Sequence, residues 1–402
     1  MKPPIQTPPR HSPPRDFGFG EDEQMLRDLA RRFLDERLPI KRLRELVADD
    51  HESVYEHGQP AGWDRGLWKQ IVEMGWPGLA VPEEAGGAGF KMVGIAGLIE
   101  EVGRHALPSP LLATLNASFV LRAADTDAAR AQMARIADGA SASLAITDER
   151  GTWEPGACDV SARADRDDLV LSGTAYFVQD ALKVDSLLTT ARIGDELALC
   201  AVPTDVAGLS LVQHHIHDLT RDQATARFDQ VRVRSDSIVS RHGKADLCRA
   251  WPALLVGVAA DLCGSNERQL QTTVEYAKSR KQFDHPLGFF QAVKHPLVDA
   301  MVAIDRARSL LYHAACCIDQ DTSDAETAAR MAKSAASDAA AFISNRSVQL
   351  HGGIGFTWEC DIHLFFKRSM HNQALYGDGV HQRRKIADEL IGPIGHRGDS
   401  SS

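Results

Sequence analysis

The chain has 402 residues, of which 44% are hydrophobic and 25% are charged, and its formal net charge is −10. This length exceeds the usual size of one hydrophobic core, so we expect two or three domains, or one large composite, of an ordinary globular protein. The acidic balance argues against general nucleic-acid affinity, because phosphate binding needs concentrated positive charge.

The N-terminal segment 1–17 is rich in proline and has no apolar core of the kind that a secretory signal needs. It therefore predicts a disordered leader and no export. The longest uncharged apolar stretch, residues 250–260, is too short to cross a bilayer, so no membrane span is expected. The seven cysteines show no paired C-x-x-C spacing, which indicates neither a metal site nor a disulfide framework and favours a reducing cytoplasm.

Helical periodicity opens the ordered part of the chain. Residues 21–38 predict a first helix, with one face made of five apolar side chains: Met25, Leu26, Leu29, Phe33 and Leu34. Further helices are predicted at residues 67–76, 93–106 and 126–139, with a turn-rich stretch at 81–90. These segments predict an N-terminal helical domain over residues 18–140.

From about Ser141 the pattern changes to short β-prone runs that are separated by polar or glycine-containing breaks. The runs lie at residues 142–147, 168–178, 186–192, 196–203, 209–214 and 224–234. We therefore predict a compact β domain over residues 141–244. Helical periodicity then returns and predicts a C-terminal helical domain over residues 245–395, followed by a frayed tail at residues 396–402.

Four motifs occur in order along this helical, β and helical arrangement. Residues 74–90, MGWPGLAVPEEAGGAGF, resemble the N-terminal Pro-Glu-Glu loop of the acyl-CoA dehydrogenase family, and residues 228–233, FDQVRV, resemble the end of its β domain. Residues 276–291, YAKSRKQFDHPLGFFQ, and 348–369, VQLHGGIGFTWECDIHLFFKRS, resemble the two C-terminal signatures of the family. The resemblance covers nearly the whole chain after Gly18, and colinear agreement of this kind is highly specific.

The resemblance implies an α+β fold with an N-terminal helical domain, a middle β-barrel or sandwich domain and a C-terminal four-helix bundle. It also implies a dimer, or a dimer of dimers, that binds FAD between the β domain and the C-terminal helices. In the family reaction a base takes the α-proton of an acyl-CoA thioester while the β-hydride passes to the flavin, giving a trans-2-enoyl-CoA. An electron-transfer flavoprotein then accepts the electrons. Positioning carries much of the rate of such a reaction.

Nine positions match cofactor contacts of the family. Six would meet the adenine and phosphate end of FAD, partly across a subunit interface: Arg280, Phe283, Gln291, Gln349, Gly352 and Gly353. A guanidinium suits phosphate because it donates two parallel hydrogen bonds, and glycine lets backbone approach a cofactor. A surface cation, a core aromatic and a helix C-cap are the structural alternatives. Three positions stand where the family contacts the flavin ring: Thr147, Phe177 and Gln179.

The segments at the flavin end depart from the family pattern. Thr147 is followed by Asp148 in place of the usual glutamate, and the Gly-Ser-Asp run of the family is absent. Gln179 occupies a position where a small hydroxyl residue is usual. These departures make the resemblance weaker at the flavin ring than at the adenine end.

The usual catalytic base is also missing. In many members a glutamate follows a tyrosine, but Tyr376 is followed by Gly377. A second subgroup carries its base on the first long C-terminal helix, where this chain has Leu254, and Leu255 replaces a nearby arginine that often helps to bind CoA. Asp378 lies one residue further along. It is either the base of a rearranged loop or a turn residue between two glycines.

We favour a partner chain that supplies the carboxylate. The YGDG run, residues 376–379, resembles subunits of bacterial members that work as heteromers on bulky steroid side-chain thioesters. A self-sufficient homo-oligomer that uses Asp378 is one alternative, and a catalytically silent scaffold that binds flavin or acyl-CoA is another. The acyl group is not specified, because pocket depth depends on side chains that a sequence does not place in space.

Overall fold

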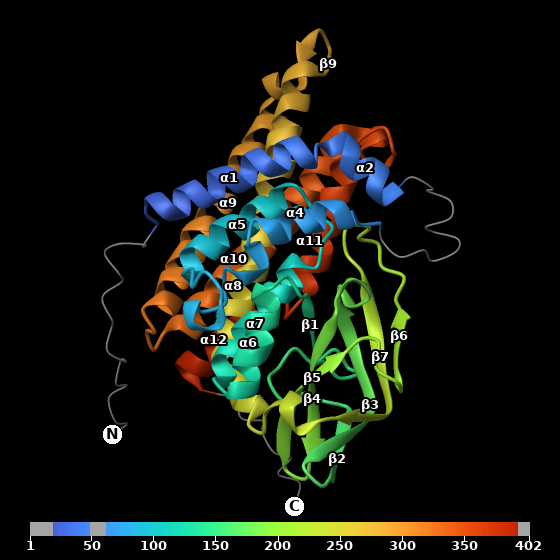
Figure 1. Ribbon diagram of the computed structural model, residues 1–402. Helices are drawn as coiled ribbons and strands as arrows, with labels where there is room; N and C mark the ends of the chain where they lie inside the picture. Colours follow the sequence, from blue (N-terminus) through green and yellow to red (C-terminus); the bar gives the residue numbers. More distant parts are fainter. Residues whose placement is uncertain (1–18, 49–61, 393–402) are drawn as a thin grey trace, which may run out of the picture.

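The computed structural model describes residues 19–48 and 62–392. The predicted leader and tail lie outside these residues. A helical region, a sheet and a second helical region follow one another along the chain, and Figure 1 shows the sheet at the lower right of the packed helices. The predicted α+β class with helical, β and helical parts is therefore confirmed.

The N-terminal region is built from α1 (Glu21–Arg37), α2 (Ile40–Ala48), α4 (Arg65–Glu73), α5 (Met92–Arg104), α6 (Leu111–Ala124) and α7 (Asp127–Ala137). Helices α1, α4, α5 and α7 match the predicted segments. Helix α6 was not predicted, because it is buried over residues 111–121 and therefore shows no polar stripe that would reveal a helical period.

The buried face of α1 differs from the predicted one. Leu26, Ala30 and Leu34 are buried at a spacing of four residues, whereas Met25 is 65% exposed and Leu29 is 43% exposed. The prediction was wrong for these two residues because the helix carries two adjacent apolar stripes, and only one of them packs against α5.

The middle region is one eight-stranded sheet. Its strands are β1 (Ala142–Ala145), β2 (Val160–Asp165), β3 (Asp168–Gln179), β4 (Ser186–Ile193), β5 (Glu196–Pro203), β6 (Leu209–Gln213), β7 (Gln223–Val233) and β8 (Ile238–Ser240). The order is β6-β7-β3-β2-β4-β5-β8, and β1 pairs parallel to β4 outside this path. Among the described residues the sheet does not close into a barrel. Strand β2 was not predicted because five of its six side chains are at least partly exposed and half of them are polar.

The C-terminal region contains α8 (Gly243–Ser279), α9 (Gln291–Asp319), α10 (Ala325–His351), α11 (Ile362–Ala374) and α12 (Gly379–Ile391). Helix α10 packs against the other four, which confirms the predicted helical bundle. Helix α8 contains a window that is long and apolar enough to cross a membrane, but 83% of that window is buried inside the protein. We therefore interpret α8 as the core helix of the bundle.

Helices α5 and α8 approach each other so closely that glycine is required at the contact. A Cβ atom on Gly264 would lie 1.8 Å from the Glu100 carbonyl oxygen, and a Cβ atom on Gly103 would lie 2.1 Å from the Asp261 carbonyl oxygen. Both distances are far below van der Waals contact with rigid backbone. The two glycines thus fix the spacing between the N-terminal region and the C-terminal bundle.

Substituting Gly264→Ala is therefore expected to force α5 and α8 apart. We expect the free energy of unfolding to fall by about 3 kcal/mol or more, measured by urea denaturation. The matched control is Gly288→Ala, because a Cβ atom there meets its nearest neighbour, the Ala277 carbonyl oxygen, at an ordinary 3.4 Å. Equal losses in the two variants would contradict the packing argument.

Candidate active site

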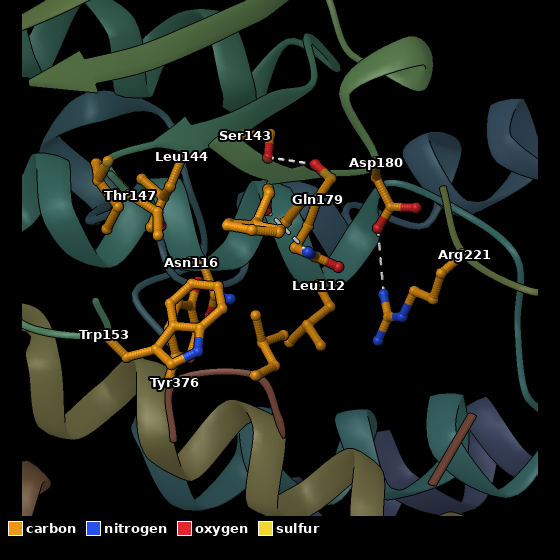
Figure 2. Close-up of a pocket in the computed structure, with 14 residues that line it drawn as sticks. Leu112, Asn116, Ser143, Leu144, Thr147, Trp153, Gln179, Asp180, Arg221 and Tyr376 are labelled. Carbon is orange, nitrogen blue, oxygen red and sulfur yellow. Dashed lines mark hydrogen bonds and ion pairs between the residues drawn. The ribbon is translucent and has the colours of Figure 1, made fainter. Parts of the chain in front are cut away.

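A pocket lies where β1, the end of β3, helix α6 and the segment before α12 meet (Figure 2). The walls combine apolar side chains with a polar and aromatic set: Asn116, Ser143, Thr147, Trp153, Phe177, Gln179, Asp180, Arg221 and Tyr376. Apolar walls with a few convergent polar groups are typical of a small-molecule site.

The three residues predicted to contact the flavin ring lie together in this pocket. Thr147, just after β1, is bridged to β3, since the Tyr176 amide donates to the Thr147 carbonyl oxygen at 3.0 Å. Phe177 and Gln179 lie within the last three residues of β3. Side chains about 30 residues apart in sequence are thus brought to one wall by strand pairing.

The backbone at Phe177 is unusual. Its φ is +55°, a left-handed conformation that an aromatic residue seldom adopts, and it lies at a register shift between β3 and β7. The shift re-aims the side chain, whose ring centroid lies 6.3 Å from that of Trp153. Strain of this kind clusters at functional sites, so the conformation supports a role for this wall of the pocket.

An aromatic cluster closes the end of the pocket next to α12. The ring of Tyr376 lies 5.5 Å from Trp153 and 5.4 Å from Trp251, centroid to centroid, in edge-on geometry. Tyr376 is only 4% exposed, and burial raises the pKa of its phenol. The Asn116 side chain interacts with the phenol of Tyr376, and its Oδ1 atom is buried against α8, 3.3 Å from the position that a Cβ atom on Gly257 would take. Asn116 therefore helps to hold Tyr376 at this end of the pocket.

A buried network of charges supports the pocket from behind. Arg221 bridges the Asp180 carboxylate at 3.2 Å and the Asp261 carboxylate at 2.9 Å, and Arg368 donates to Asp261 from Nε at 2.9 Å and from Nη2 at 2.6 Å. All four side chains are no more than 3% exposed. The network joins the end of β3 and the loop before β7 to α8 and α11, so it holds the middle region and the C-terminal bundle together behind the pocket.

Asp180 is the carboxylate among the pocket-lining residues, but it is not available as a base. Burial by itself would raise its pKa, yet the neighbouring Lys183 and Arg221 outweigh burial and hold the pKa of Asp180 below its usual range. Its two oxygens are occupied by Lys183 at 3.1 Å and by Arg221. A carboxylate held in this way is a weak proton acceptor.

Asp378 does not line the pocket. It is exposed and forms the N-cap of α12, where its Oδ1 atom accepts a hydrogen bond from the His381 amide at 2.8 Å. Capping of this kind is a common structural use of aspartate. Leu254, the position of the alternative base, is fully buried and apolar. The geometry therefore supports the turn interpretation of Asp378 and leaves the pocket without an available carboxylate of its own.

Sequence reasoning missed Lys333, which anchors the turn after Tyr376. Its Nζ atom donates to the carbonyl oxygens of Gln373 and Gly377, both at 2.9 Å, and lies 3.1 Å from Ser337 Oγ. The side chain is completely buried, and burial lowers its pKa to about 7. In the sequence, the one sign of such a role is that Lys333 stands among the small residues of α10.

The residues predicted for the adenine end lie elsewhere. Arg280, Phe283 and Gln291 are exposed at the connection between α8 and α9, which contains β9 (Lys281–Gln282) and β10 (His285–Pro286) and projects beyond the other helices at the top of Figure 1.

Phe283 is 85% exposed and has a φ of +51°. A strained, exposed aromatic residue at a hairpin tip indicates a surface that meets a ligand or another chain.

The remaining adenine-end residues are also exposed and lie outside the pocket: Gln349, Gly352 and Gly353. They lie at the end of α10 and in the next turn, η6 (Gly352–Phe356), and all three are exposed. A Cβ atom on either glycine would meet nothing within 4 Å, so the backbone there is open to approach. None of the six adenine-end residues lines the pocket. In a single chain both groups face solvent, which is where residues that meet a cofactor held by another subunit would lie.

The described residues fit FAD, the cofactor implied by the resemblance. The pocket offers the aromatic rings of Phe177 and Trp153 and the amide of Gln179. The exposed guanidinium of Arg280 suits the phosphates. These are the contacts that a flavin and a dinucleotide phosphate need, from two surfaces that a second chain would bring together.

Comparisons with known proteins agree with this geometry. The model of the acyl-CoA dehydrogenase N-terminal domain matches residues 20–140, and that of the C-terminal domain matches residues 256–391. The acyl-CoA dehydrogenase IpdE2 of Mycobacterium tuberculosis is 31% identical over 373 residues, which cover 92% of this chain and 98% of that protein.

Two solved structures have the same fold. One, described as the Tcur3481-Tcur3483 steroid ACAD, is 29% identical with a TM-score of 0.80 and covers 92% of this chain and 98% of its own. The other, the ChsE4-ChsE5 complex of Mycobacterium tuberculosis, is 23% identical with a TM-score of 0.83 and covers 94% of this chain and 100% of its own. With the family models and the relative that spans nearly the whole chain, they show that this protein belongs to the acyl-CoA dehydrogenase family.

Proposed function

We propose that this chain is one subunit of an FAD-dependent acyl-CoA dehydrogenase and that a homologous partner chain supplies the catalytic carboxylate. The observation that carries the proposal is the pocket itself, which has flavin-type contacts but no available carboxylate. The bound flavin would supply a hydride acceptor for the β-carbon of the thioester. The substrate class is a bulky acyl-CoA, and an electron-transfer flavoprotein is the proposed acceptor.

The residues of this chain have positioning roles in the proposal. Phe177 and Trp153 would bound the flavin ring, and Gln179 would donate to its polar edge. Tyr376, held by its contacts with Trp153 and Trp251, would close the pocket and exclude water. Arg280, at the end of α8 and the base of the hairpin, would hold phosphate oxygens of a cofactor whose ring lies in the other chain.

The related structures support a two-chain arrangement and a steroid-like acyl group. The structure at 29% identity carries the names of two chains and is described as a steroid ACAD. The other is described as a complex of two proteins, although its 23% identity shows only the fold. The exposed adenine-end residues of this chain are consistent with a second subunit.

The test is flavin reduction by thioesters. The chain is purified alone and together with any homologue encoded beside it, and bleaching of bound flavin is followed anaerobically on adding a series of acyl-CoA thioesters that includes steroid side-chain ones. Bleaching only in the mixture supports the proposal. Bleaching by the lone chain that is lost in Asp378→Ala would instead make the chain self-sufficient. Flavin binding without bleaching beside every partner would make it a silent scaffold.

Asp378→Ala is expected to have a structural effect rather than a catalytic one. Loss of the N-cap hydrogen bond to His381 should lower the free energy of unfolding by about 1 kcal/mol, while flavin reduction in the reconstituted complex changes less than about twofold. Asp378→Asn, which keeps a capping oxygen but not the charge, should restore the stability. A drop in the bleaching rate of a hundredfold or more in both variants would identify Asp378 as the base.

A further inference from the structure

The side chain of Gln179 has a defined orientation in the pocket. Its Nε2 atom donates to the Phe177 carbonyl oxygen at 2.9 Å, and its Oε1 atom lies 2.6 Å from Nε2 of His371. A carbonyl oxygen only accepts hydrogen bonds, so the atom that faces Phe177 must be the amide nitrogen. The amide oxygen then faces His371, and His371 Nε2 must carry the proton that it donates. Together the two contacts fix the orientation of the Gln179 amide and place the proton of His371 on Nε2.

An amide nitrogen has two hydrogens, and only one is used by Phe177. Figure 2 shows the Gln179 amide in the middle of the labelled pocket side chains, between Thr147 and Arg221. The second N–H is therefore available to a ligand in the pocket. If the amide were rotated by 180°, Oε1 instead of the N–H would face the pocket and would repel an acceptor atom of a ligand.

His371 lies on α11, and its neighbours on that helix are anchored to Asp261. Arg368, one turn earlier, donates twice to Asp261, and the next residue, Asn372, donates to Asp261 Oδ1 at 2.7 Å. Burial lowers the pKa of His371, and the charged groups that face it are Asp218, Asp180, Arg221 and Arg368. The Nε2 proton is donated in both the neutral and the charged ring, so the contact with Gln179 does not depend on protonation.

We propose that His371 is a positioning residue for the flavin: by donating to Gln179 Oε1 it fixes the amide so that a Gln179 N–H points into the pocket. This inference rests on the proposed function, because the ligand of that N–H would be the flavin. It accounts for the glutamine in a place where the family usually has a small hydroxyl residue. A hydroxyl can rotate to donate by itself, whereas a long amide needs a second group to set its orientation.

The inference predicts that His371 acts only through Gln179. The test compares wild type, His371→Ala, Gln179→Thr and the double variant, each as the flavin-loaded chain in whatever complex it forms. The readouts are the FAD dissociation constant, measured on deflavinated protein, and the flavin midpoint potential. His371→Ala should weaken FAD binding by about 3- to 10-fold, the range of one hydrogen bond. The potential should fall by about 30 mV for each tenfold loss of preference for the reduced flavin.

In the Gln179→Thr background, the hydroxyl no longer needs orientation, so adding His371→Ala should change neither readout. His371→Gln keeps an N–H donor at this position and should retain most of the wild-type affinity. Thermal unfolding of each deflavinated variant separates loss of the fold from loss of orientation.

Unchanged FAD affinity and potential in His371→Ala would overturn the inference. The same loss in both Gln179 backgrounds would also overturn it, because His371 would then act independently of the amide. A wild-type protein that holds no flavin, alone or in any complex, would instead defeat the proposed function and the inference with it.

Discussion

Replacing Asp261 with alanine is expected to be the most destabilising single change in this protein. The Asp261 carboxylate accepts hydrogen bonds from Arg221, Arg368 and Asn372 and is fully buried. Its removal would leave the guanidinium of Arg368 without a carboxylate among its described ion pairs and that of Arg221 with Asp180 alone. Breaking a buried pair in this way costs about 3 to 5 kcal/mol, a large share of a typical total of about 5 to 15 kcal/mol.

The loss is expected to appear as a lower urea midpoint and as loss of bound flavin, because Asp180 and Arg221 also line the pocket. The control is Glu275→Ala, which breaks an ion pair with Lys278 whose side chains are 71% and 66% exposed and should cost less than about 1 kcal/mol. Asp261→Asn should fall between the two, since an amide oxygen still accepts. An Asp261→Ala variant as stable as the control would show that the network does not hold the parts of the fold together.

The fold could be predicted from the sequence because its elements carry local signals. Apolar spacing located α1 and α5, and short β-prone runs between polar or glycine-containing breaks located β3 to β7. The missed elements lack those signals. Helix α6 is buried on all sides along residues 111–121, and half of the side chains of β2 are polar. In both cases the environment created by the rest of the chain, rather than local periodicity, decides the structure.

The site was predictable only where it matched a known motif. Thr147, Phe177 and Gln179 were placed by resemblance, and the structure brings them together in the pocket. The groups that orient the pocket were not predicted, because their partners lie far away in sequence. Arg368 reaches Asp261 across 107 residues, and each looks like an ordinary charged helix residue when read alone.

The same limit explains why Asp378 remained ambiguous in the sequence. Adjacency to Tyr376 suggested a base, while the flanking glycines suggested a turn. Only the capping contact with His381 and the exposure of Asp378 distinguish them. Whether Asp378 is a base or a turn residue depends on the direction in which its carboxylate points, and the neighbouring residues in the sequence do not determine that direction.

Lys333 should give the native state a pH dependence that a single substitution removes. Burial lowers its pKa from the usual 10.5 to about 7 in the native protein. The Nζ atom donates to the carbonyl oxygens of Gln373 and Gly377 and to Ser337 Oγ, and the two carbonyl contacts need only the two N–H groups of a neutral amine. Between pH 7 and 10.5 the unfolded chain therefore binds one proton more than the native protein at this position.

Stability contributed by this residue must rise with pH across that window, with a slope approaching about 1.4 kcal/mol per pH unit, and must be constant below it, where both states are protonated. Lys333→Met should abolish this rise. The measurement is the difference between the unfolding free energies of wild type and Lys333→Met from pH 6 to about 10, which cancels the cysteines and tyrosines that titrate in the same range. Lys69→Met, at a side chain that is 77% exposed, is the control and should give a flat difference. A flat difference for Lys333→Met as well would mean that the native lysine stays charged, and the turn after Tyr376 would then be held by a cation rather than by a neutral amine.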